Sequence, residues 1–353
     1  VYQQMKFIQN KKLGYDKTQL LVLPNSWALG KNETVFKHEI LKDPRVINAT
    51  ISGYKPAGPS NSNNAMFYPE GKENQVMKTL RYDVDEQYIP TLGMQLAAGR
   101  NFSKSFATDS DAVVVNETAV SAFGLGSNPV GKQIVAQKNS ADGKNRPYTV
   151  IGVVKDFHFR SLHEPITPLL MVLNPEWGLI IKIKTADVAG LLASMKQQWN
   201  KFGTEEPFTY AFMDDLYNKT YQAESKTGRI LNIFTLLTIF VACLGLFGLA
   251  IYTTEQRSKE IGIRKVLGAS VLQVVNLLSA DFLKLILLAC FVAFPLAYWA
   301  MHNWLQDFAY RITISWWIFA LAAFTAVLIA LFTISFQAVK AALANPVKSL
   351  RSE

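Results

Sequence analysis

Three apolar runs in the last third of the chain are too long to be elements of an ordinary water-soluble core. Asp, Glu, Lys and Arg are all absent from residues 230–254, 285–306 and 312–339. A helix of about 20 apolar residues spans the hydrocarbon core of a bilayer. We therefore predict an all-α transmembrane domain over residues 230–353, with three spans at about 230–252, 282–304 and 314–336.

The basic residues outside the spans predict the orientation of the protein in the membrane. The loop between the second and third spans has only Arg311, whereas the loop between the first and second has Arg257, Lys259, Arg264 and Lys265. Cytoplasmic loops are enriched in Lys and Arg. We therefore expect the first loop to be cytoplasmic, and residues 1–229 to lie in the periplasm of a bacterium with an inner membrane.

Residues 1–229 alternate short runs of β-branched and aromatic residues with helical patterns. Such runs, bounded by Gly, Pro, Asn or Asp, are typical of strands, and we predict strands at residues 19–23, 46–53, 76–84, 112–115, 148–154, 169–173, 179–183 and 208–212. We predict helices at residues 33–42, 116–123 and 188–202, with polar loops at 61–64 and 139–145. Asn116 and Asp187 are expected N-caps.

These elements predict an α+β extracytoplasmic domain over residues 1–213, with mixed sheets, helices and two subdomains. Residues 214–229 are polar and helical in pattern, and they run directly into the first apolar segment. We therefore predict a stalk helix at 214–229 that joins the domain to the membrane.

Composition narrows the classes of partner. The 353 residues carry a formal net charge of +9, but the lysines are scattered. Without a basic stripe or a nucleic-acid motif, nucleic acid is not an expected partner. Both cysteines, Cys243 and Cys290, fall in predicted spans, so residues 1–229 have neither a disulfide framework nor a Cys-based metal site.

No catalytic or cofactor-binding pattern is recognisable. The chain has no Gly-x-x-x-x-Gly-Lys-Ser/Thr segment, so we expect it not to hydrolyse nucleotide. His158 and His163 lie near Asp156 and Glu164, but their spacing matches no compact metal motif. An ordinary loop is favoured there over a metal site. We predict no catalytic, cofactor-binding or metal-ligating residues in this chain.

The charged segment between the first two spans predicts a short helix at about 258–268. Glu260 lies early and Arg264 late, an order that complements the helix dipole, and Gly268 is placed to end the helix. Ile263 and Leu267 lie on one face, together with Val266. Two interpretations are open from these residues: a helix lying on lipid headgroups, or a helix that docks into a groove of a cytoplasmic partner.

Several segments resemble the MacB/FtsX-type ABC transporter permeases. In the membrane part these are 254–269 (TEQRSKEIGIRKVLGA) and 344–350 (ANPVKSL). In the soluble part, the segments that resemble the family's periplasmic core domain are 99–102 (GRNF), 114–117 (VVNE) and 150–157 (VIGVVKDF). The family usually has four spans per unit, one of them before the periplasmic domain. With three spans and a first residue Val1, the chain is expected to be a C-terminal half or an N-terminally truncated unit.

The resemblance implies a mechanism and a set of coupling residues. In this family two permease units pair with two cytoplasmic ATPase subunits, whose ATP-driven motion moves the periplasmic domains, a process called mechanotransmission. ATP and Mg²⁺ would then bind the partner ATPase, and no cofactor binds this chain. The helix seated on the ATPase would comprise Glu260, Ile261, Gly262, Ile263, Arg264, Lys265, Val266, Leu267 and Gly268.

We therefore expect a permease subunit of an ABC-type efflux or mechanotransmission system. Its expected partners are a cytoplasmic ABC ATPase, a second permease unit in a homodimer or fused pseudo-dimer, membrane lipids, and a periplasmic adaptor or outer-membrane channel. An alternative is a non-transporting envelope protein that senses a ligand or regulates a cell-wall hydrolase. A periplasmic enzyme is disfavoured because no catalytic constellation is visible. The sequence names no substrate.

Overall fold

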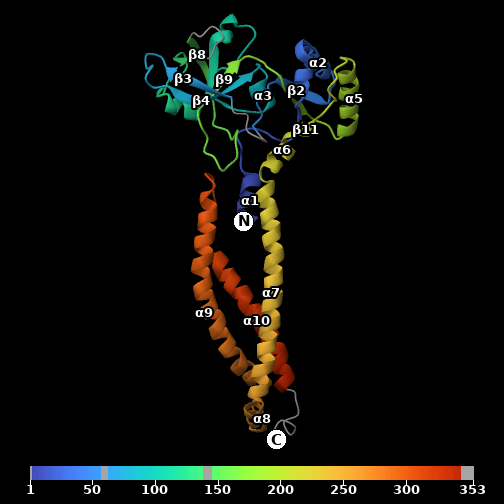
Figure 1. Ribbon diagram of the computed structural model, residues 1–353, viewed down its shortest axis with the longest axis vertical. Coiled ribbons are helices and arrows are strands. Elements are labelled where there is room, and N and C mark those ends of the chain that lie inside the picture. The colour runs from blue at the N-terminus through green and yellow to red at the C-terminus, as the bar shows by residue number, and fades with distance from the viewer. Residues whose placement is uncertain (1, 57–62, 138–144, 343–353) are drawn as a thin grey trace. The chain divides into compact units, whose positions relative to one another are not determined.

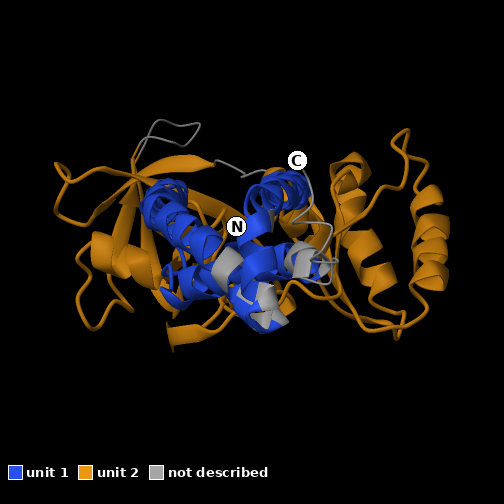
Figure 2. Cartoon of the chain, turned by 90° about the horizontal axis from the view of Figure 1, so that it is seen from below, with its two compact units in different colours: residues 1–4, 224–353 blue, residues 5–223 orange. Residues whose placement is uncertain are grey.

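The computed structural model describes residues 2–56, 63–137 and 145–342 of the chain. The chain divides into two compact units, one of residues 5–223 and the other of residues 1–4 and 224–353 (Figure 2). The first unit is α+β and the second is all-α, as predicted. The division falls inside the segment predicted as a stalk.

The first unit contains two sheets, and the smaller one has four antiparallel strands in the order β11-β1-β10-β2. Its strands are β1 (Leu20–Leu23), β2 (Val46–Ile51), β10 (Leu179–Ile183) and β11 (Ala211–Phe212). Helices α2 (Glu33–Ile40) and α5 (Val188–Asn200) lie beside it (Figure 1). The alternate apolar residues of the strands and the apolar faces of both helices form one core, in which Phe36 meets Trp199 edge to face at 5.7 Å.

The larger sheet has seven strands in the order β5-β8-β6-β9-β4-β3-β7. The strands are β3 (Asn64–Pro69), β4 (Met77–Val84), β5 (Leu96–Gly99), β6 (Ala112–Asn116), β7 (Gln133–Ala136), β8 (Arg146–Val154) and β9 (Leu169–Leu173). A further pairing of β7 with β8 closes six of these strands into a ring. The sheet is mixed, because β4 pairs with β9, and β6 with β8, in parallel.

The remaining helices of this unit are short. They are α1 (Tyr2–Asn10), which begins in the other unit, η1 (Ser26–Asn32), α3 (Tyr88–Thr91), η2 (Ala107–Asp111), α4 (Glu117–Ala122) and α6 (Met213–Thr220). Asn116 caps α4 by accepting a hydrogen bond from Ala119 N, and Asp187 caps α5 by accepting one from Gly190 N. Both predicted N-caps are therefore confirmed.

All eight predicted strands are present, but three strands were missed and one prediction was too long. The missed strands are β3, β5 and β7, and the predicted strand at 208–212 is reduced to Ala211–Phe212. β3 begins at Asn64, at the end of the predicted polar loop 61–64, whose residues 61–62 lie outside the described chain, as does most of the loop 139–145. β5 and β7 have four residues each.

A buried carboxylate joins the two sheets. The Asp85 side chain, just after β4, accepts hydrogen bonds from Lys37 Nζ at 2.6 Å, from Ile51 N at 2.9 Å and from the Thr50 hydroxyl. Lys37 and Asp85 are both almost fully buried. A buried ion pair is tolerated when its hydrogen-bonding capacity is filled, and here the partners come from α2 and β2 of the smaller sheet.

The second unit consists of long apolar helices. They are α7 (Gln222–Gln256), α8 (Ser258–Val266), α9 (Val271–Gln306) and α10 (Trp317–Ala342). In the described part of the chain, three helical stretches have the length and composition to cross a membrane, at Gln222–Gln256, Ser279–Gln306 and Trp317–Phe336. They cover the three predicted spans, although the third helix begins at Trp317 rather than at 314.

These helices have only a small shared core. Ala250 of α7, Phe282 of α9 and Ala330 and Ile334 of α10 form a buried cluster. Most large apolar side chains of the three helices are exposed instead. A helix that is apolar all round and exposed is typical of a membrane span, so this outer surface is suited to contact lipid.

Candidate functional site

The helix α8 stands between α7 and α9 and is separated from each by a few residues. Only Arg257 lies between Gln256, the last residue of α7, and the start of α8 at Ser258. The Ile261 amide donates to Arg257 O at 2.9 Å, so the helical hydrogen bonding resumes directly after that residue. The predicted helix at 258–268 is therefore present, with its regular part ending at Val266.

Gly268 ends this helix through a specific backbone conformation. Its φ is +94°, in the left-handed region that glycine adopts without steric cost. The Ala269 amide donates back to Arg264 O at 2.9 Å, the six-to-one hydrogen bond of a Schellman motif. Ser270 then caps α9 in a reciprocal capping box with Gln273, so the turn between α8 and α9 is defined by local chemistry.

The side chains of α8 divide into an inner and an outer set. Ile261 is 4% exposed and packs within its own unit, whereas Ile263 is 53% and Leu267 81% exposed. Glu260 and Arg264 form an exposed ion pair at 2.7 Å. The outer surface is therefore an apolar ridge with a paired charge beside it, and Ile261 anchors the helix from the other side.

The structure describes only some of the remaining predicted coupling residues. Gly262 is buried beside Ile261 and Gly268 is exposed at the helix end. The side chains of Lys265 and Val266 lie outside the described residues, although their backbone is helical. The ridge of Ile263 and Leu267 is thus described without its third predicted member.

An ion pair that the sequence pattern did not reveal links the start of α8 to α9. Arg257 donates to Asp281 Oδ2 at 3.0 Å, and Lys284 approaches the other oxygen of that carboxylate at 3.7 Å. All three side chains are substantially exposed. Such exposed pairs contribute less than about 1 kcal/mol to stability. The Arg257–Asp281 pair was missed because 24 residues separate the partners.

The first residue of α7, Gln222, directly follows a buried tyrosine, Tyr221. Tyr221 lies between α6 and α7 with non-helical torsions, φ −108° and ψ 20°, so the predicted stalk is not one continuous helix. Its hydroxyl accepts a hydrogen bond from the Leu162 amide at 2.7 Å, and its ring stacks on His163 at 6.3 Å. Tyr217, one turn earlier, donates its hydroxyl to Ile8 O at 3.0 Å. Tyr221 is thereby attached to the loop after β8.

That loop is held at both ends by one buried residue. Asn116 Nδ2 donates to Asp156 Oδ1 at 2.9 Å and to Thr167 O at 3.1 Å. Asn116 Oδ1 accepts from the Leu169 amide at 2.9 Å as well as from its own helix α4. Asp156 in turn accepts from the Thr118 amide and hydroxyl at 3.0 and 2.7 Å. The segments 114–117 and 150–157, on which the family resemblance depends, are therefore in direct contact.

The third such segment, 99–102, meets the same strand. Gly99 pairs with Gly152 across β5 and β8, and a Cβ on Gly99 would lie 2.2 Å from Ile151 O. A Cβ on Gly152 would lie 2.2 Å from Arg100 O. Only glycine permits this backbone approach, so these motif residues are explained by packing.

His158 of this loop lies in a partly apolar environment rather than in a metal site. Burial and the nearby charge of Lys11 lower the pKa of His158 to about 4, against the opposing effect of Asp156. His158 is therefore neutral at pH 7, and its backbone amide donates to Leu13 O at 2.7 Å. Among the described residues no group of three or more His, Cys, Asp or Glu side chains is arranged to hold a metal ion.

Comparison with known families matches both parts of the chain. Residues 34–197 match the MacB-like periplasmic core domain, and residues 232–346 match the FtsX-like permease C-terminal domain. Together these two matches cover most of the 353 residues. The second match ends at residue 346, within the predicted motif 344–350, and this motif lies outside the described residues.

The chain is similar to several export ATP-binding/permease proteins and to a solved periplasmic domain. The macrolide export ATP-binding/permease protein MacB of Neisseria gonorrhoeae is 29% identical over 207 residues, 53% of this chain and 30% of that protein. A probable syringafactin export ATP-binding/permease protein, SyfD of Pseudomonas syringae, is 26% identical over 199 residues, 53% of this chain and 29% of that protein. The chain thus spans under a third of these relatives. The periplasmic region of MacB from Actinobacillus actinomycetemcomitans superposes with a TM-score of 0.42 and 17% identity, covering 60% of this chain and 96% of that one.

An α+β domain of periplasmic type, followed by apolar helices of permease type, defines a membrane permease component. The chain belongs to the MacB/FtsX-type family of ABC transporter permeases. The resemblance seen in the sequence motifs is confirmed by the family matches, and the predicted fold class is confirmed by the elements of the structure.

Proposed function

We propose that this chain is the permease subunit of an ABC-type efflux system and works by mechanotransmission. In this proposal it lies in the inner membrane of a bacterium, with residues 1–229 in the periplasm and α8 in the cytoplasm. ATP and Mg²⁺ bind a cytoplasmic ABC ATPase, and the 353 residues themselves contain no phosphate-binding loop. A second permease unit and a periplasmic adaptor or outer-membrane channel complete the proposed assembly.

The observation that carries this proposal is an exposed apolar ridge on a helix whose opposite side is buried. Ile263 and Leu267 are exposed on α8, while Ile261 and the Arg257–Asp281 pair hold the opposite side and the start of the helix. An exposed apolar ridge that projects from a fixed support suits insertion into a groove of a partner. The site is therefore suited to receive force without bending away from it.

The helix α7 is suited to carry that force. It has 35 residues without interruption, which corresponds to a length of about 50 Å. At one end it adjoins α8, and at the other it follows Tyr221, whose hydroxyl holds the Leu162 amide. A displacement of α8 would therefore reach the loop of residues 157–168 through covalently continuous helix and a buried hydrogen bond.

The names of the relatives favour export over the alternative. MacB and SyfD are both named export ATP-binding/permease proteins. A non-transporting regulator of a cell-wall hydrolase would use the same helices. The two functions are distinguished by the effect of deleting the gene. Deletion of the gene changes the export of a compound in the first case, and only the activity of an envelope enzyme in the second.

Photo-crosslinking in cells tests the docking ridge. A crosslinking amino acid placed at Leu267 is expected to capture an ABC ATPase, identified by mass spectrometry, whereas the same group at the exposed Lys104 is not. Replacing Leu267 with Asp is expected to reduce co-purification of that ATPase at least tenfold. Burial of a leucine side chain contributes roughly 1.5–3 kcal/mol, and a buried carboxylate adds a desolvation cost.

The matched control is Lys259→Glu, a charge reversal on the same helix outside the predicted contact residues. It is expected to leave co-purification within a factor of about two, as surface substitutions away from a site usually do. Undiminished ATPase binding by Leu267→Asp, or capture of lipid alone at Leu267, would count against docking and favour a helix that lies on the membrane surface.

A further inference from the structure

The first unit contains a pocket at one edge of its larger sheet. Its volume is about 270 Å³. It is open at the start of β3 and near the beginnings of the parallel strands β4 and β9. The lining residues are Asn64, Lys78, Leu80, Arg160, Thr167 and Pro168.

The register of strands β3 and β4 places the residues at the base of this pocket side by side. Asn64 of β3 lies directly opposite Leu80 of β4, and Lys78 is on the same face two residues earlier. The Leu80 amide donates to Pro168 O at 3.2 Å, which places the end of the loop beside the strand. Leu80 is buried, whereas Lys78 is exposed, so the pocket has an apolar base and a polar rim.

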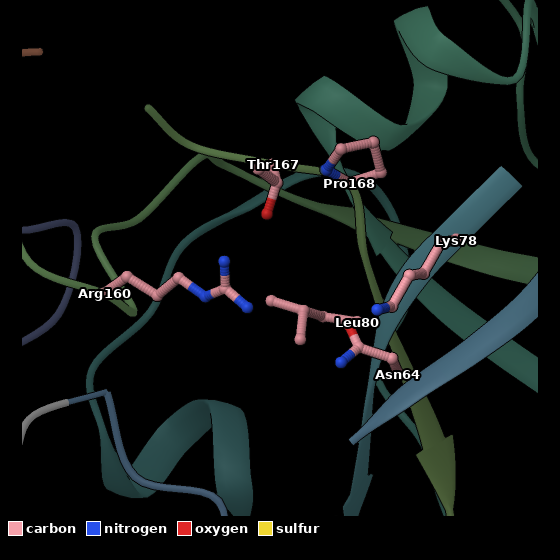
Figure 3. Close-up of a pocket in the computed structure, with 6 residues that line it drawn as sticks. All are labelled: Asn64, Lys78, Leu80, Arg160, Thr167 and Pro168. Atoms are coloured by element: carbon pink, nitrogen blue, oxygen red, sulfur yellow. The ribbon is translucent and has the colours of Figure 1, made fainter. Parts of the chain in front are cut away.

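Polar groups from separate segments converge over that base. Figure 3 shows the guanidinium of Arg160 and the hydroxyl of Thr167 directed toward Leu80, with Lys78 on the other side of Leu80. Arg160 Nε and Thr167 Oγ1 are both buried and have no hydrogen-bond partner among the described residues. Buried polar atoms are nearly always satisfied in folded proteins, and an acceptor bound in this pocket would satisfy both of these donors.

The charge balance selects the kind of acceptor. Arg160 Nη1 already donates to Glu164 Oε2 at 2.8 Å, which offsets one of the two positive charges. About one positive charge is left for a ligand, which suits a singly charged carboxylate better than a doubly charged phosphate. Arginine recognises the two oxygens of a carboxylate with its planar donors.

We propose that this pocket binds a small organic carboxylate. The carboxylate accepts from Arg160 and Thr167 with Lys78 at the rim, and the apolar part of the ligand contacts Leu80 and Pro168. The volume lies just below the roughly 300–1,000 Å³ typical of drug-sized ligands. The ligand is therefore about the size of a capped amino acid, and no function of this pocket is required for the docking of α8.

Ligand-observed saturation-transfer NMR tests this site with the full chain in lipid nanodiscs. The probe is N-acetyl-leucine, which carries a carboxylate and an apolar side chain, and empty nanodiscs correct for partition into lipid. A small ligand with one charged anchor is expected to bind with a dissociation constant on the order of 1 mM. N-acetyl-leucinamide, which lacks the charge, is expected to bind at least tenfold more weakly.

Single substitutions locate the binding. Arg160→Gln and Lys78→Gln are each expected to weaken binding, the first by about tenfold and the second by about threefold, through loss of charge-assisted hydrogen bonds. Lys78 is exposed, so its variant is expected to fold even if the Arg160 variant does not. Thr167→Val replaces the hydroxyl with a methyl group of similar size. The control Arg146→Gln removes an exposed arginine paired with Asp111 outside the pocket and is expected to change nothing.

Three results would overturn the proposal. They are equal signals from the acid and the amide, unchanged binding in the Lys78→Gln and Thr167→Val variants, and a loss in the Arg146→Gln variant as large as that at the pocket. Inorganic phosphate is tested as a competitor. If it displaces N-acetyl-leucine with an inhibition constant below the dissociation constant of N-acetyl-leucine, the assignment to a carboxylate is overturned.

Discussion

At the scale of single residues, Asn116 shows how one side chain can serve both local and distant structure. Its oxygen caps α4, and the same oxygen and its amide group bind Leu169, Asp156 and Thr167. It is completely buried. The N-cap was predictable from the sequence because its partner lies three residues away. The other bonds were not predictable, since their partners are 40 to 53 residues away.

Replacing Asn116 with Ala is expected to lower the unfolding free energy by about 3 kcal/mol. Loss of an N-cap costs roughly 1 kcal/mol, and leaving the Leu169 amide and the Thr167 carbonyl unpaired adds about 1–3 kcal/mol. For a unit of this size the unfolding midpoint should fall by about 6–12 °C, as measured by tryptophan fluorescence of the full chain in detergent. Asn128→Ala, at an exposed position, is the control and should shift the midpoint little. Equal midpoints for the two variants would contradict this role.

At the scale of elements, the sequence predicts the short helix α8 but does not predict the break in the helix at Tyr221. The start of α8, its end at Gly268 and its exposed apolar face follow from charge order, glycine placement and helical period. The break between α6 and α7 was not predicted, because no Pro or Gly interrupts residues 214–227. It arises where the Tyr221 hydroxyl meets the Leu162 amide, 59 residues away in the sequence.

Replacing Tyr221 with Phe is expected to loosen the attachment of the loop while keeping the ring in place. The buried Leu162 amide loses its acceptor, so its protection against hydrogen exchange should fall at least about fivefold, which corresponds to about 1 kcal/mol. Mass-spectrometric exchange of the full chain measures this at the peptide containing Leu162. Tyr210→Phe, at an exposed tyrosine, provides the comparison. Unchanged protection in the Tyr221 variant would show that the hydrogen bond does not hold the loop.

At the scale of the whole molecule, the chain passes through one long apolar helix, α7, between the first unit and α8. If basic loops face the cytoplasm, positions in these two parts lie on opposite sides of the membrane. Lys104 of the first unit and Lys259 of α8 are both exposed. Each can be replaced by Cys in a background from which Cys243 and Cys290 have been removed.

The Lys104→Cys variant is expected to react with a membrane-impermeant maleimide in cells whose outer membrane has been permeabilised. The Lys259→Cys variant is expected to react only after the inner membrane is also opened. The readout is the gel shift of the labelled chain. Labelling of Lys259→Cys before that step would reverse the proposed orientation, and with it the assignment of α8 to a cytoplasmic ATPase.

The amino-acid sequence alone determined the three membrane helices, most of the strands, the bounds of α8 and the family. Each of these depends on local quantities, such as the length of an apolar run or the residues that cap a helix. The tertiary structure decided that β7 closes onto β8, that Ile261 turns inward while Leu267 stays exposed, and that Arg160 and Lys78 share one pocket. Those arrangements depend on contacts between residues far apart in the chain, whose pairing is set by packing of the whole unit and leaves no periodic signal in the sequence.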